Sequence, residues 1–180
     1  MECNITEIEG DIMLAQTQTI VIPVSSNGTG ISYLAMRFFT KFPYMKEKYE
    51  SFCQRKLLEP GKLWIYYTPT RGILLFPTGT GDCDLTEEEI LRKGLRKFAS
   101  VYAEKNITSV SFPLPELASL PWQEVLDIIR EELSDCDIPI SVFTKYIPSS
   151  GKIISAMEII CSPITEEVKE RIKKEICFEI

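Results

Sequence analysis

The sequence contains no histidine and no two cysteines in a C-x-x-C spacing. Structural zinc sites are usually built from such cysteine pairs, with or without histidine, so we expect no metal site. Without histidine the chain also cannot form a Ser–His or Cys–His nucleophile pair. An enzyme built on this sequence would have to use carboxylates, lysine or a group of its own substrate. The six cysteines that are present lie far apart, at Cys3, Cys53, Cys83, Cys136, Cys161 and Cys177.

Long apolar runs and an excess of basic residues are also missing. No apolar stretch is long enough to cross a bilayer, and no apolar leader segment opens the chain, so we expect no membrane association. Scattered thiols without a disulfide pattern are typical of a reducing compartment, which favours a cytoplasmic location. The net charge of -6 argues against the phosphate backbone of a nucleic acid as a direct partner.

The chain is organised around the stretch from Thr19 to Pro43. Ile20-Val21-Ile22 is typical of a buried strand, and a loop with two glycines, Gly28 and Gly30, follows it. A helical pattern of apolar residues then runs to Phe42. A strand, a glycine loop and a helix in this order can point backbone N–H groups at an anion, although an ordinary turn of an α/β domain has the same pattern.

The rest of the sequence alternates between strand and helix patterns. Strands are predicted at 4–8, 110–112 and 138–143, a hairpin at 63–76, and helices at 43–56, 86–105 and 122–133. This alternation indicates an α/β fold in three α/β/α layers around a mixed, mostly parallel sheet. Ligands of such sheets bind in loops at the carboxyl ends of the strands, which here are Ser25–Ser32, Pro77–Asp84 and Pro113–Pro121.

Several motifs occur in an order that resembles a macrodomain: I-x-G-D-I, I-V-x-P-V, L-A-M-R-F-F-T-K-F-P and L-L-F-P-T. The branch that they resemble most contains the DNA ADP-ribosyl glycohydrolase antitoxins and the ADP-ribosyl-acyl hydrolases. The resemblance implies a macrodomain-like domain over residues 1–146. Beyond it we expect a strand (153–161) and a helix (165–176), as a C-terminal extension over 147–180 packed on the same domain.

The resemblance also implies a set of ligand-binding residues. Gly10-Asp11 matches the family's Gly-Asp, whose carboxylate typically accepts a hydrogen bond from the adenine amino group, although an ordinary turn aspartate is the alternative. Ser25 stands where the family has an asparagine that faces the distal ribose. The residues expected to bind a ligand are Asp11, Ile12, Ser25, Ser26, Asn27, Gly28, Thr29, Gly30, Thr78 and Gly79.

The chain departs from the family at the positions used for catalysis. Ser32 replaces the lysine that this branch uses, and a serine cannot form a Schiff base. The segment Pro113–Pro121 has three prolines and no glycine where the family has a glycine-rich loop that cradles the diphosphate. We therefore expect no catalytic residue of the family type and no cofactor.

Other residues carry weaker signals. Asp82, Asp84 and the glutamates 87–89 could bind a cation or act as acid and base, but such a run also suits a helix N-terminus. Cys83 could be a reactive thiol. Phe143 or Tyr146 could stack on a base, although core packing is the alternative for Phe143.

Three functions stay open at this stage. The first is a module that binds ADP-ribose or a related nucleotide without turnover. The second is a protein-interaction domain, related to antitoxins or phage defence, that kept the fold and lost the ligand. The third is an ADP-ribosyl hydrolase with non-standard catalytic residues.

Overall fold

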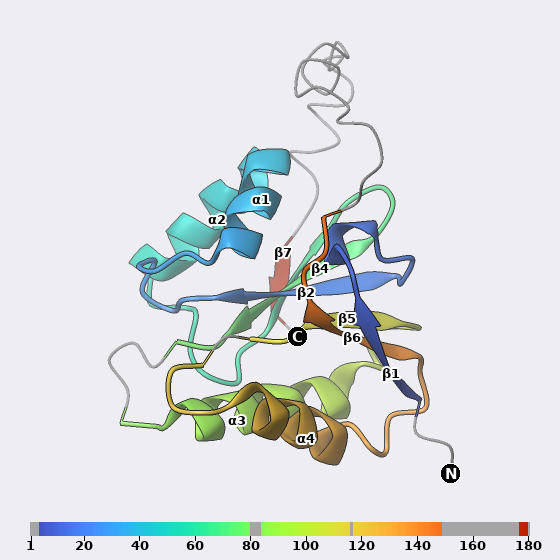
Figure 1. Cartoon of the computed structure of the whole chain (residues 1–180). Helices are drawn as coiled ribbons and strands as arrows, with labels where there is room; N and C mark the ends of the chain where they lie inside the picture. Colours follow the sequence, from blue (N-terminus) through green and yellow to red (C-terminus); the bar gives the residue numbers. More distant parts are fainter. Residues whose placement is uncertain (1–3, 80–83, 116, 149–176, 180) are drawn as a thin grey trace.

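The computed structural model describes residues 4–79, 84–115, 117–148 and 177–179 (Figure 1). Asp82, Cys83 and Glu116 lie outside these ranges, as do the strand predicted at 153–161 and the helix predicted at 165–176. The C-terminal extension therefore stays a prediction, apart from one short strand at its end.

In these ranges the chain forms a seven-stranded sheet with the order β1-β6-β5-β2-β4-β3-β7. Neighbours from β1 to β4 in this order run parallel, and β3 runs antiparallel to both β4 and β7. The sheet is thus mixed and mostly parallel, as predicted. The strands are β1 (Ile5–Glu9), β2 (Thr19–Val24), β3 (Trp64–Tyr67), β4 (Gly72–Pro77), β5 (Val110–Pro113), β6 (Ile140–Lys145) and β7 (Cys177–Glu179).

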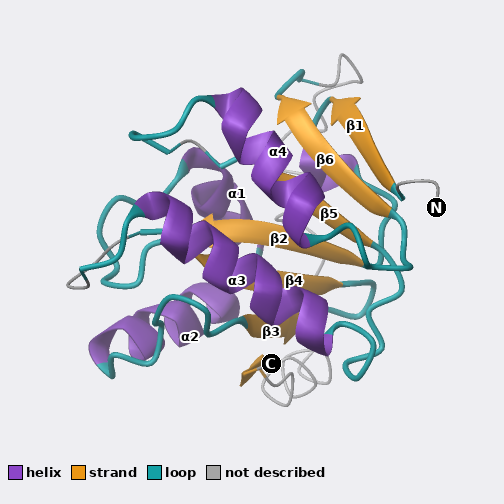
Figure 2. Cartoon of the chain, turned by 90° about the horizontal axis from the view of Figure 1, so that it is seen from below, coloured by secondary structure: helices purple, strands orange, loops and turns teal. Residues whose placement is uncertain are grey.

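Two pairs of helices cover the two faces of the sheet, which confirms the predicted three layers (Figures 1 and 2). Helices α1 (Tyr33–Lys41) and α2 (Pro43–Gln54) lie on one face, and α3 (Glu87–Val101) and α4 (Trp122–Glu132) on the other. A single 3-10 turn, η1 (Ile12–Leu14), follows β1. None of the described helices combines the length and the apolar character that crossing a bilayer requires.

Helix α3 shows how local sequence and packing agree. Thr86 and Glu89 form a capping box that satisfies N–H groups at its start. Its apolar stripe packs on the sheet, and Gly94 allows the closest approach, because a Cβ atom there would lie 2.3 Å from Cζ of Phe76. The helix was predicted to run to about Lys105 but ends at Val101, followed by turns up to Asn106, whose φ of 55° is left-handed.

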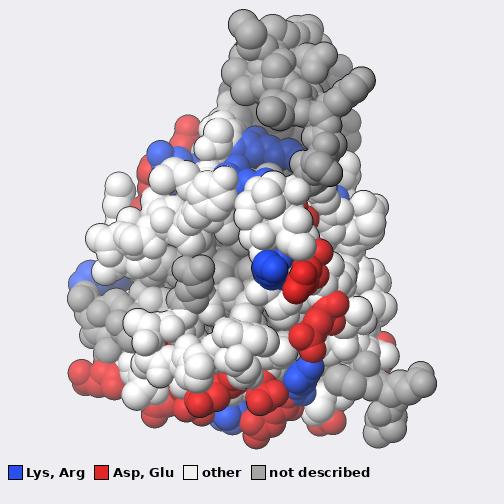
Figure 3. Space-filling view, viewed as in Figure 1, with Lys and Arg blue, Asp and Glu red and all other residues white. Residues whose placement is uncertain are grey.

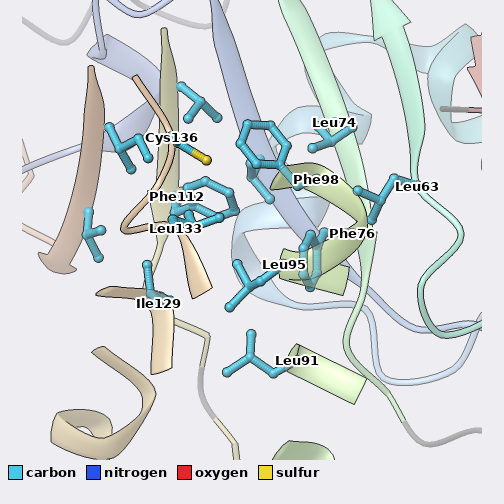
Figure 4. Packing of buried hydrophobic residues seen from close by; sticks show 14 of the residues in the cluster. Leu63, Leu74, Phe76, Leu91, Leu95, Phe98, Phe112, Ile129, Leu133 and Cys136 are labelled. Carbon is cyan, nitrogen blue, oxygen red and sulfur yellow. The ribbon is translucent and has the colours of Figure 1, made fainter. Parts of the chain in front are cut away.

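Each face of the sheet has its own core. Below it, α3 and α4 enclose Phe76, Phe98 and Phe112, whose rings meet edge to face (Figure 4). Above it, α1 and α2 bury Phe38 and Tyr49 against β2 and β4. Because both faces of β2 and β4 are buried, these strands are continuous apolar runs in the sequence.

Candidate functional site

A cavity of about 630 Å³ opens at the carboxyl ends of β2, β4, β5 and β6. Residues on or just after each of these strands line it: Pro23, Thr78, Pro113 and Phe143. This is the edge of the sheet at which the sequence predicted the ligand loops. The volume falls within the range of about 300–1,000 Å³ that is typical of small-molecule sites.

The two walls of the cavity differ in chemistry. Helix α1 contributes Tyr33 and Arg37 to one wall. The end of β5 and the loop after it contribute leucines and prolines to the other, together with Trp122 at the start of α4. Figure 3 shows that acidic side chains gather along the lower edge of this view, over α3 and α4, and that the surface between these helices and α1 is largely uncharged. Among the described residues that line the cavity, only Arg37 and Lys145 carry charge, and both are cationic.

The Asp11 carboxylate accepts its hydrogen bonds mainly from Arg37. The guanidinium donates from Nη1 to Oδ1 at 2.9 Å and from Nη2 to Oδ2 at 2.6 Å, and the N–H of Met13 donates to Oδ1 at 3.0 Å. The Asp11 side chain is 7% exposed. Burial by itself raises the pKa of Asp11, but the hydrogen bonds from Arg37 and Met13 outweigh it and hold this pKa below its ordinary value.

Two tyrosines flank this ion pair. The Arg37 guanidinium carbon lies 5.3 Å from the ring centre of Tyr146 and 5.8 Å from that of Tyr33, and the two rings meet edge to face at 6.4 Å. Tyr33 is 71% exposed and Tyr146 50% exposed, so both offer ring surface to a ligand. The hydrogen bonds from Arg37 to Asp11 also raise the pKa of Arg37, which keeps the guanidinium charged.

The Asp11–Arg37 pair predicts a pH-dependent contribution to stability. Because the pKa of Asp11 is depressed in the folded state, its carboxylate stabilises the fold above the ordinary pKa of about 3.9 and loses this effect as pH falls through the depressed value. We expect Asp11→Asn to lower the free energy of unfolding by about 1 kcal/mol at pH 7, since a charged acceptor is lost.

Urea unfolding of wild type and Asp11→Asn between pH 7 and pH 3 measures this effect. The difference between the two proteins should shrink toward zero at the acidic end. Asp127→Asn is the control, because the Asp127 side chain is 73% exposed. A difference that stays constant down to pH 3 would contradict the assigned role of the Asp11 carboxylate.

The predicted glycine loop folds on itself. Oδ1 of Asn27 accepts hydrogen bonds from Ser25 Oγ at 2.6 Å, from Thr29 N at 3.0 Å and from Thr29 Oγ1 at 2.6 Å. Gly28 and Gly30 have φ values of 80° and 64°, which glycine adopts without strain. The Ser25 backbone oxygen accepts a hydrogen bond from Tyr49 Oη at 2.9 Å, which ties the loop to α2.

The structure distributes the predicted site residues over three places. Ile12 and Thr78 line the main cavity, and Asp11 lines a neighbouring one of about 530 Å³ that shares Gly10 and Phe143 with it. The loop 25–30 borders neither cavity, and Gly79 packs close to Ser25. A ligand role for these residues stays a prediction.

Ser32, which the sequence resemblance aligns with a catalytic lysine, caps helix α1. Its Oγ accepts a hydrogen bond from Ala35 N at 3.1 Å, and the residue lines the cavity. The three glutamates among the candidate catalytic carboxylates also have structural partners. Glu89 belongs to the capping box, Glu88 pairs with Arg92, and Glu87 accepts hydrogen bonds from the backbone N–H groups of residues 118 and 119.

These last contacts involve the loop that follows β5. The Glu87 carboxylate takes up two of its N–H groups and the Ser119 hydroxyl, and these hydrogen bonds lower the pKa of Glu87 despite some burial. Apolar side chains of this loop, Leu117 and Leu120, line the cavity instead. No group of three or more metal-ligating side chains occurs among the described residues.

Sequence reasoning missed several cavity residues. Tyr33 and Arg37 are four residues apart and therefore share one face of α1, yet a polar face of a helix is normally just solvated. In the sequence, both residues stand on the polar face of the helical pattern, and this position was the available signal. Tyr146 was named as a candidate for stacking, and it does line the cavity together with Phe143.

No protein-family model matches the chain. A DNA ADP-ribosyl glycohydrolase of Mycobacterium tuberculosis (strain ATCC 25618 / H37Rv) is 29% identical over 156 residues, which covers 82% of this chain and 43% of the relative. A DNA ADP-ribosyl transferase–DNA ADP-ribosyl glycohydrolase fusion protein of Thermosipho africanus is 25% identical over 171 residues, covering 83% of this chain and 43% of the relative. The chain thus spans about two fifths of the length of these curated relatives.

The comparison with solved structures finds proteins of the same kind. The macrodomain of Mycobacterium tuberculosis DarG superposes with a TM-score of 0.68 at 26% identity, covering 81% of this chain and 98% of that one. Thermosipho africanus DarTG in complex with ADP-ribose gives a TM-score of 0.69 at 25% identity, covering 87% of this chain and 44% of that one. The predicted fold and the family resemblance are thereby confirmed: the chain is a macrodomain related to DNA ADP-ribosyl glycohydrolases.

Proposed function

We propose that this chain binds ADP-ribose, or a related nucleotide derivative, in the cavity at the carboxyl ends of β2, β4, β5 and β6. The observation that carries the proposal is the cavity itself, which combines exposed tyrosine rings, a fixed arginine and the volume of a small-molecule site. Aromatic faces suit a base, and cationic donors suit phosphate or carbonyl oxygens. A structural relative was solved in complex with ADP-ribose, which supports the same ligand class.

We also propose that the bound ligand is not hydrolysed through a lysine of the kind that the related enzymes use. Ser32 uses its hydroxyl to cap α1, and a hydroxyl cannot form a Schiff base. Lys145, the one lysine among the described residues that line the cavity, lies on β6, on a different element from Ser32. We therefore infer a binding module and not a hydrolase of the usual type.

A protein partner is the second candidate, because large apolar side chains stand exposed around the cavity mouth. Trp122 is 52% exposed and Tyr33 71% exposed. The fusion relative joins a DNA ADP-ribosyl transferase to its glycohydrolase, so a transferase is the kind of protein partner to test. Direct binding to nucleic acid is not expected, given the acidic net charge.

Calorimetric titration with ADP-ribose tests the first proposal. We expect micromolar binding to the wild type and at least a tenfold loss in Thr78→Trp, because an indole at Thr78 fills part of the cavity. Thr70→Trp is the matched control, since Thr70 is exposed in the turn between β3 and β4. Absence of heat and of a thermal shift at millimolar ADP-ribose would refute the ligand class and leave the protein partner.

A further inference from the structure

We propose that Arg37, and not Asp11, reads the base of the bound nucleotide, and that the cavity therefore prefers a 6-oxopurine, of the hypoxanthine or guanine type, to adenine. This inference rests on the proposed function, because it concerns which base the nucleotide site accepts. It follows from which hydrogen-bonding groups at this end of the cavity are already used and which remain available.

Most of the acceptor capacity of the Asp11 carboxylate is in use. Each of its oxygens receives one N–H of Arg37, and Oδ1 also receives the N–H of Met13. The side chain is 7% exposed, so a ligand has little access to the remaining lone pairs. An adenine amino group needs an acceptor, and a bidentate arginine–carboxylate pair is among the stronger contacts that it would have to displace.

Arg37 has donors left and a position from which to use them. A guanidinium carries five N–H groups, and the bidentate pair uses two of them. Arg37 lines the main cavity, whereas Asp11 lines the neighbouring one. Arginine pairs with the O6 and N7 acceptors of a 6-oxopurine in its commonest base-specific contact, whereas adenine replaces the O6 acceptor by an amino donor.

Aromatic rings determine where the base would lie. The Tyr33 and Tyr146 rings meet edge to face at 6.4 Å, which leaves no parallel slot between them, so a base stacks on the exposed face of one ring. The Arg37 guanidinium carbon lies within 6 Å of both ring centres. Arg37 and both rings therefore lie together at one end of the cavity, where the edge of a base placed beside these rings meets the arginine.

The other charged group of the cavity points to the same choice. Lys145, at the end of β6, is an ammonium donor that cannot accept a hydrogen bond. Among the described residues that line the cavity there is no aspartate or glutamate. Among the described residues, the charged side chains that a base meets here are donors only, and this favours a base edge rich in acceptors.

The experiment compares two ligands that differ only in the base. ADP-ribose and inosine diphosphate-ribose are titrated into the wild type by calorimetry. They differ by the amino group of adenine and the carbonyl group of hypoxanthine. We expect inosine diphosphate-ribose to bind roughly tenfold tighter, the usual order of effect for one satisfied against one unsatisfied hydrogen bond.

Arg37→Ala should reverse the preference, because it frees the Asp11 carboxylate for the adenine amino group. Arg96→Ala is the matched control, since Arg96 forms a comparable bidentate pair with Glu132, at 2.8 Å for both contacts, on the opposite face of the sheet. Asp11→Asn, which keeps Arg37, should retain the wild-type preference. Melting curves establish that each variant is folded, and the wild-type comparison needs no variant at all.

The outcomes separate the two proposals. If neither ligand binds, the proposed function fails and this inference fails with it. If ADP-ribose binds as tightly as inosine diphosphate-ribose, or more tightly, the site is a nucleotide site but Arg37 does not select the base. An unchanged preference in Arg37→Ala would equally overturn the inference.

Discussion

Tyr146→Ala is expected to weaken nucleotide binding by roughly tenfold to a hundredfold, because stacking of a base on an aromatic ring contributes about 1–3 kcal/mol. The ring is half exposed, lines the cavity and lies over the Arg37 guanidinium. Its removal takes away the stacking surface and also one of the two rings that hold Arg37 in place. Both ADP-ribose and inosine diphosphate-ribose should lose affinity, since stacking does not depend on which base is bound.

Titration of Tyr146→Ala beside Tyr44→Ala measures this effect. Tyr44 is 36% exposed on α2 and is not among the residues that line the cavity, so its removal controls for the loss of a surface tyrosine. The melting temperature of both variants should stay near that of the wild type. Equal affinity in Tyr146→Ala and wild type would show that the base lies elsewhere.

Phe98→Ala is expected to lower the free energy of unfolding by about 3–5 kcal/mol, the usual range for deleting a buried phenyl ring. Phe98 is fully buried between α3 and the sheet, with its ring edge to face against Phe112 at 5.4 Å and stacked on Tyr102 at 5.9 Å (Figure 4). Because Phe98 is fully buried, water does not reach the space that the ring leaves, and its removal creates a cavity in the core between the sheet and α3.

Urea unfolding at pH 7 measures the loss, with Phe98→Leu as a milder companion that fills most of the space. The leucine variant should lose clearly less than the alanine variant, because the energetic cost grows with the volume left empty. Losses below about 1 kcal/mol for the alanine variant would mean that the lower core rearranges to close the gap.

Much of the fold could be predicted because its elements are locally encoded. The capping box at Thr86 and the apolar stripe behind it define α3, and the turn at 68–71 joins the two strands that form the predicted hairpin. The end of α3 was misplaced because the helical pattern continues into turns past Val101. Strand β7 was missed because three residues carry too little pattern to reveal a partner more than a hundred positions away.

The site was harder to predict because its key contacts join distant residues. Asp11 and Arg37 are 26 positions apart, and either residue alone looks like an ordinary turn or surface residue. The loop 25–30 has the residues of a ligand loop, yet its hydroxyls satisfy Asn27 within the loop. A sequence records which groups can form hydrogen bonds, but only the packed chain decides which of them are already satisfied.

The two edges of the sheet bear on how the protein behaves when it is concentrated. Strand β1 forms one edge, has exposed carboxylates at Glu7 and Glu9, and changes register against β6 at its end. In the part of the chain that the structure describes, the other edge is β7, which has three residues. Charges, an irregular register and a short outer strand each discourage the addition of a further strand from another molecule. Addition of a strand from another molecule is therefore disfavoured at both edges that the described residues form.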